Sequence, residues 1–222
     1  FDSLFAIGFK DAFVPVKFHR KQPHLVYALT NMGRDKKAAV LYDLLQQKVV
    51  KTLFEHPSYD VDWIVFSQKD NEPLFAQYTD WKMQYHFLAD RAEALYQKVS
   101  KQLNEYEVVF TGTDEAETKV VIRTYSDRTM GGYYLYDLKN EELSLLADAS
   151  PWLKKENMAA VKPIAYQSRD GLKIHGYLTI PNGAKAKNLP LVVVPHGGPW
   201  TRDVWRFDQN VQFLANRGYA VL

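Results

Sequence analysis

The chain has 222 residues, 46% of them hydrophobic and 24% charged, a composition typical of a globular protein with one large domain or two ordinary ones. Its 28 basic and 26 acidic residues leave a net charge of +2, which gives no electrostatic reason to expect nucleic acid or a membrane surface as a partner. The absence of cysteine excludes disulfides and thiolate metal sites, and it leaves the localisation open between cytoplasm and periplasm.

The two ends of the chain indicate a piece of a longer or processed protein. FDSLFAIGFKD, at the start, has neither an initiator methionine nor the basic segment of a signal peptide. The last residues, GYAVL, read as the middle of a strand. The longest apolar run, residues 189–195, is too short to cross a bilayer.

The first 150 residues read as short strands, and one internal similarity organises them. VYALTNMGRDKKAAVLYDLLQQKVV (26–50) aligns with VVIRTYSDRTMGGYYLYDLKNEELS (120–144) at a shift of 94 positions, and both contain LYDL before polar turn residues. Each copy predicts three strands joined by turns, as in a blade of a β-propeller. The shift is close to two blade lengths, and residues 61–90 fit the blade between. Chance recurrence of LYDL in a strand-rich protein is the alternative.

One segment departs from the β pattern. DRAEALYQKVSKQL (90–103) carries apolar residues at helical spacing and predicts a helix. Asp90 and Glu93 invite a catalytic interpretation, but they resemble a capping box at the positive end of the helix dipole. We therefore assign them a capping role and no chemistry.

A polar, proline-flanked stretch at 148–163 predicts a linker, which divides the chain into domains 1–152 and 153–222. The sequence after the linker predicts a hairpin that turns at Asp170–Gly171, because glycine accepts the positive φ of such turns. His175 falls on the polar face of this hairpin and is expected to be solvated.

The end of the chain predicts a β–α–β unit. LPLVVVP (189–195) is a continuous apolar run, which predicts a strand buried on both faces. VWRFDQNVQFLANRG predicts a helix closed by Gly218, and YAVL begins another strand. Strand, glycine loop, helix and strand in this order are typical of an α/β fold.

The glycine loop in this unit is the candidate site. Gly197 and Gly198 follow the carboxyl end of a strand, where open α/β sheets bind their ligands, and Pro199 stiffens the exit. Glycines let backbone N–H groups approach an oxygen that becomes negative during acyl transfer, and His196 is expected to brace the loop. A tight turn with a buried, hydrogen-bonded histidine is the alternative. Phosphate binding is less favoured, since neither GxGxxG nor GxxxxGK[ST] occurs.

Three motifs in the last part of the chain resemble a known family. SRDGLKIHGYL, PHGGP and FLANRGYAVL resemble the opening of the peptidase domain in the prolyl oligopeptidase family, and most closely its acylaminoacyl-peptidase and dipeptidyl-peptidase-like branch. The resemblance is sharp over residues 160–222 and looser before them. It implies a partial β-propeller of about three blades followed by the N-terminal part of an α/β-hydrolase domain.

The resemblance also implies an activity and roles for the loop residues. It implies a serine peptidase that hydrolyses short peptides through an acyl-enzyme. The N–H of Gly198 would contribute to the oxyanion hole, Gly197 would allow the turn, and His196 would hold the loop. No cofactor is implied.

This chain departs from the family pattern in one respect. The family nucleophile lies in a G-x-S-x-G elbow followed by an aspartate and a histidine, and no serine here has that context. Asp170 and His175 precede the oxyanion loop, so chain order excludes them from the triad. We expect the triad beyond Leu222 and expect the chain alone to be inactive.

Two other functions stay open at this stage. One is a carboxylesterase with the same sheet and loop, and the other is a non-catalytic propeller binding module. The six histidines include no HExxH or comparable pairing, so no metal site is expected. The sequence does not determine the oligomeric state. Residues 1–222 made alone are expected to expose unpaired sheet edges and to aggregate or stay partly unfolded.

Overall fold

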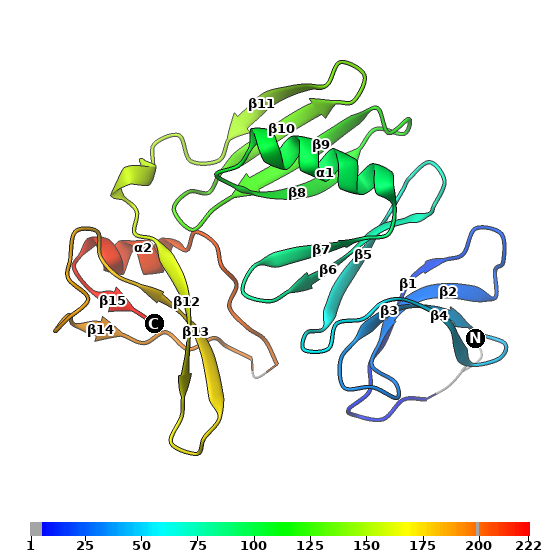
Figure 1. The fold of residues 1–222 in the computed structure, drawn as a ribbon, viewed down its shortest axis with the longest axis horizontal. Helices are drawn as coiled ribbons and strands as arrows, with labels where there is room; N and C mark the ends of the chain where they lie inside the picture. The colour runs from blue at the N-terminus through cyan, green and yellow to red at the C-terminus, as the bar shows by residue number, and fades with distance from the viewer. Residues whose placement is uncertain (1–5, 199) are drawn as a thin grey trace. The chain divides into compact units, whose positions relative to one another are not determined.

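The computed structural model describes residues 6–198 and 200–222. The chain divides into two compact units, one reaching to Lys98 and including Glu115–Glu117, the other comprising Val99–Asp114 and Thr118–Leu222. Each unit is built mainly from antiparallel sheets (Figure 1). Neither α-helix in the described ranges is long and apolar enough to span a membrane.

The first unit begins with a four-stranded antiparallel sheet in chain order. Its strands are β1 (Phe13–Phe18), β2 (Leu25–Thr30), β3 (Ala38–Asp43) and β4 (Lys48–Phe54). All six residues of β2 are buried, because it is a central strand with apolar neighbours on both faces. Val26 and Val40 pack in one core cluster, while Tyr27 and Leu29 belong to another.

A three-stranded antiparallel sheet follows in the same unit. Its strands are β5 (Val61–Phe66), β6 (Pro73–Thr79) and β7 (Met83–Phe87). The predicted helix is confirmed as α1 (Asp90–Gln102), with Asp90 and Glu93 in its first turn. The ring of Tyr96 lies 4.9 Å from that of Tyr85 and 5.4 Å from that of Phe87, so the helix packs on the last strand of this sheet.

The second unit opens with a sheet that repeats the first one. Its strands are β8 (Glu107–Thr113), β9 (Lys119–Tyr125), β10 (Gly132–Asp137) and β11 (Glu142–Asp148), again antiparallel and in chain order. The shift of 94 positions carries the bounds of β3 and β4 onto those of β10 and β11. The internal similarity is therefore a structural repeat, and it also relates β1 to β8.

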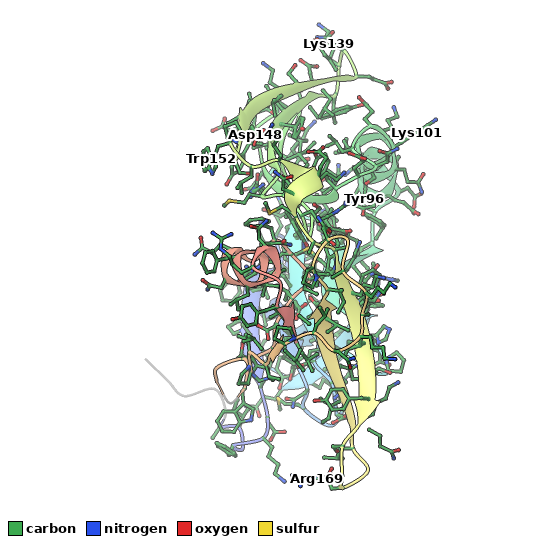
Figure 2. All side chains as sticks on the ribbon, turned by 90° about the vertical axis from the view of Figure 1, so that its left-hand side faces the viewer. Tyr96, Lys101, Lys139, Asp148, Trp152 and Arg169 are labelled. Atoms are coloured by element: carbon green, nitrogen blue, oxygen red, sulfur yellow. The ribbon has the colours of Figure 1, made fainter. Side chains whose placement is uncertain are left out.

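The rest of the second unit is a mixed sheet with one helix. The sheet has the order β12-β13-β15-β14, and the linker before it holds only the short 3-10 helix η1 (Lys155–Asn157). The elements are β12 (Val161–Gln167), β13 (Lys173–Thr179), β14 (Leu191–Val192), α2 (Gln209–Asn216) and β15 (Ala220–Val221). Figure 2 shows Arg169 at the tip of the β12–β13 hairpin, where the turn was predicted.

The predicted β–α–β unit is confirmed. Strands β14 and β15 pair in parallel, and α2 lies between them in the sequence. Gly218, with φ +92°, ends the helix as expected, and its N–H donates to the carbonyl oxygen of Ala215.

The sequence predicted that residues 189–195 form a strand buried on both faces, and this prediction is wrong. Strand β14 has two residues, and the exposed fractions of Leu191 and Val193 are 53% and 60%. The reason is its place at the edge of the sheet, where one side has no neighbouring strand among the described residues. Apolar character predicted the strand but not its position in the sheet.

Candidate oxyanion loop

The loop after β14 carries the three residues predicted for the site. His196, Gly197 and Gly198 are all exposed. The Nδ1 atom of His196 lies 2.7 Å from the carbonyl oxygen of Gly197, so the N–H of that nitrogen donates to the loop backbone when this tautomer is present. The side chain therefore contacts the backbone that it was expected to brace, and its role stays a prediction.

Gly198 is the position in this loop where glycine is required. Its φ is +138°, a region that side chains rarely adopt, and a Cβ atom there would lie 2.9 Å from the backbone nitrogen of Trp200. Gly197 has no positive φ, and a Cβ atom on it would meet nothing within 4 Å among the described residues. The unusual backbone conformation is thus at Gly198, the predicted donor. Pro199 lies outside the described residues.

The loop is fixed on both sides by hydrogen bonds. Before it, the N–H of Val194 donates to the carbonyl oxygen of Leu222 at 2.7 Å. After it, the indole N–H of Trp205 donates to the carbonyl oxygen of Val161 at 3.0 Å, and the tryptophan is buried. The segment that carries Gly198 therefore runs between two anchored points.

Helix α2 begins directly after the second anchor. Asp208 is its N-cap, and one carboxylate oxygen accepts from the N–H groups of Asn210 and Val211 at 2.8 and 3.0 Å. The N–H of Phe207, just before the cap, donates to the carbonyl oxygen of Ser126 at 2.7 Å. The start of the helix is therefore fixed both by its own cap and by the turn between β9 and β10.

Two buried polar residues that bond to the segment before β12 and to its first residue were not anticipated from the sequence. Gln212 in α2 is 4% exposed and Asp127 in the β9–β10 turn is 8% exposed, and both form hydrogen bonds to backbone far away in the chain. The available signal was a glutamine directly after Val211 on the apolar side of a helix. No local pattern identifies what such a glutamine contacts.

The polar residues of the β12–β13 turn take no part in this site. Asp170 accepts from the hydroxyl of Ser168, and this bond, with one from the N–H of Leu172, lowers the pKa of the Asp170 carboxyl. His175 is exposed on β13, as predicted. In residues 6–198 and 200–222, no three histidine, aspartate or glutamate side chains are grouped so that they could hold a metal ion.

In the described residues, antiparallel sheets are followed by a β–α–β unit whose first strand leads into a histidine–glycine loop, and known proteins resemble this chain in sequence or in fold. No family model matches the chain. Dipeptidyl aminopeptidase BIII of Pseudoxanthomonas mexicana is 41% identical over 97 residues, which cover 40% of this chain and 14% of that protein.

Two solved structures share the fold over almost the whole chain. A prolyl endopeptidase matches 97% of this chain and 32% of its own with a TM-score of 0.65 and 14% identity. A puromycin-hydrolyzing peptidase of Mycobacterium tuberculosis matches 96% and 33%, with a TM-score of 0.66 and 14% identity. The chain thus spans about a third of these structures and a smaller share of its sequence relative. Over 97 residues the chain is therefore similar in sequence to a dipeptidyl aminopeptidase, and its fold is similar to the matched part of these two peptidase structures.

Proposed function

We propose that this chain is part of a serine peptidase that hydrolyses short peptides, and that the N–H of Gly198 is one donor of its oxyanion hole. The observation that carries the proposal is the backbone at Gly198, which is exposed, follows the end of β14 and has a conformation reserved for glycine. The relative named as a dipeptidyl aminopeptidase supports peptides as the substrate class.

The proposal includes an assignment of the two regions. The three antiparallel sheets are blades of a partial β-propeller in residues 1–152, and residues 153–222 are the first part of an α/β-hydrolase domain. The repeat that relates β1–β4 to β8–β11 supports the first assignment, and the β14–α2–β15 unit supports the second. The linker around η1 then joins the two domains.

In this mechanism a serine of the complete protein attacks the scissile carbonyl carbon, and the carbonyl oxygen becomes negative. The N–H of Gly198 donates to that oxygen. The C–N bond breaks, the amine leaves with a proton, and an acyl-enzyme remains. Water then hydrolyses the ester and releases the acid and the free serine. The role proposed for Gly198 is neither to attack nor to move a proton but to supply a fixed donor.

The substrate class can be tested on the complete protein that contains this segment. Dipeptidyl and acyl-peptide amides should be hydrolysed, and simple acyl esters should be turned over with lower kcat/KM. A fluorophosphonate should label one serine and abolish the hydrolysis. A protein that cleaves only esters would be a carboxylesterase, and a protein that neither reacts with fluorophosphonate nor cleaves any substrate would be a binding module. Either result contradicts the proposal.

A further inference from the structure

The turn between β9 and β10 is joined to the segment around the oxyanion loop by a connected set of buried hydrogen bonds. Gln212 is its centre. Its Nε2 donates to the carbonyl oxygen of Asp127 at 2.9 Å and to that of Ala159 at 2.8 Å, and its Oε1 accepts from the N–H of Ala159 at 2.8 Å. Both amide protons and the oxygen are thus used, which fixes the side chain in one orientation.

The carboxylate of Asp127 forms the second half of the connection. Its Oδ2 accepts from the N–H of Val161 at 2.8 Å, at the first residue of β12. The carbonyl oxygen of the same Val161 accepts from the indole of Trp205. One backbone unit of β12 therefore links the β9–β10 turn to the residue that anchors the end of the oxyanion loop.

A third bond joins the same turn to the same segment directly, from the N–H of Phe207 to the carbonyl oxygen of Ser126 at 2.7 Å. The three side chains involved, Asp127, Trp205 and Gln212, are each at most 9% exposed. Breaking a buried hydrogen bond of this kind is costly, because it leaves a polar group with neither a protein partner nor water. These bonds therefore hold the groups that they join in one arrangement. The turn therefore restricts where the loop can lie.

We propose that Gln212 and Asp127 are positioning residues. They act through Trp205 and Phe207 to fix the position of the loop that carries Gly198. This inference rests on the proposed serine peptidase function and adds to it a dependence of the oxyanion donor on the β9–β10 turn. The expected size of the effect follows from geometry, because a displacement of about 1 Å in a catalytic group can cost about 10²-fold in rate.

The first test compares two glutamines of the same helix in the complete protein. Gln212→Met keeps the length of the side chain and removes all three bonds. Gln209→Met is the matched control, because Gln209 is exposed on α2. With a dipeptidyl amide as substrate, we expect Gln212→Met to lower kcat by about tenfold to a hundredfold and to change KM by less than about threefold. Gln209→Met should change neither constant by more than about twofold.

The second comparison uses the carboxylate. Asp127→Asn keeps an oxygen that can accept from the N–H of Val161, so it should retain most of the wild-type kcat. Asp127→Ala removes that acceptor and should behave like Gln212→Met. Trp205→Phe removes only the indole N–H, and it replaces Gln212→Met in the test if the glutamine variant does not fold.

Amide hydrogen exchange separates failure of this inference from failure of the proposed function. Exchange in peptides covering residues 194–207 should accelerate in Gln212→Met and Asp127→Ala, while exchange in β1–β4 stays unchanged. An active enzyme whose kcat and loop exchange are the same in Gln212→Met and Gln209→Met would overturn the positioning role alone. A wild-type protein without serine reactivity would overturn the peptidase function, and the exchange data would still decide whether the turn holds the loop.

Discussion

Asp43 and Asp137, 94 positions apart, occupy equivalent turns in two different sheets. In each case one carboxylate oxygen accepts two backbone N–H groups, those of Leu45 and Gln46 after Asp43, and those of Lys139 and Asn140 after Asp137. This turn explains why LYDL recurs, because aspartate in a tight turn satisfies the N–H groups that the strands cannot pair.

The same substitution at the two aspartates should change the free energy of unfolding by different amounts. Asp43 is buried, at 3% exposed, whereas Asp137 is only partly buried, although the turn residues that follow are exposed in both cases. Asp43→Ala leaves two N–H groups without their acceptor and should lower the free energy of unfolding by about 1 to 2 kcal/mol, and Asp137→Ala should cost less. Urea unfolding of both variants checks this, with Asp43→Asn as the control that keeps an acceptor. Equal losses at the two positions would contradict it.

Gly131, before β10, is predicted to tolerate no side chain. Its φ is +66°, and a Cβ atom would overlap the carbonyl group of Thr124. Gly33 has a similar φ of +72°, with open space around it. Gly131→Ala should therefore destabilise the protein by at least about 3 kcal/mol, against about 1 kcal/mol for Gly33→Ala. Thermal unfolding of the two variants separates the overlap from the backbone strain that both share.

Asp70 should contribute a pH-dependent part of the stability. Hydrogen bonds from the N–H of Glu72 and from Ser67, together with the guanidinium of Arg91 at 2.8 Å, lower the pKa of Asp70 to about 2. The pKa in the unfolded chain is about 3.9, so the contribution is complete above that value and is lost as the pH falls towards 2. Because this pair is partly exposed, we expect less than about 1 kcal/mol.

The comparison of wild type with Asp70→Asn measures this contribution. The difference in urea midpoint should be constant between pH 5 and 8 and should shrink from about pH 4 downward. A difference in urea midpoint that does not shrink below about pH 4 would show that the charge of Asp70 does not stabilise the fold.

The sequence predicted the elements whose causes are local. Helix α1 follows from apolar spacing, the β12–β13 turn from Asp170–Gly171, and the repeated sheet from the recurrence of LYDL at a shift of 94 positions. The placement of β14 could not be predicted in this way. A run of apolar residues predicts a strand at the centre of a sheet and a strand at its edge equally well. The exposed fraction of those residues depends on the order of the strands in the sheet.

The same limit applies to the site. The loop after β14 could be expected from Gly197 and Gly198, because two adjacent glycines after an apolar run indicate a backbone turn. The bonds of Gln212 to Asp127 and Ala159 could not, because they join residues up to 85 positions apart and leave no pattern within either segment. The sequence also did not indicate which of the two glycines has the positive φ, and the backbone structure shows that it is Gly198.

The most direct measurement of the central claim deletes the N–H of Gly198 without adding a side chain. Proline would delete it too, but its φ near −65° is incompatible with +138°. Replacing Gly198 by glycolic acid in the complete protein exchanges the N–H for an ester oxygen and keeps the backbone path. The same replacement at Gly183, in an exposed turn, is the control. We predict that kcat for a dipeptidyl amide falls by about 10²–10³ at position 198 and stays unchanged at position 183. Full activity with the ester at position 198 would contradict the oxyanion role.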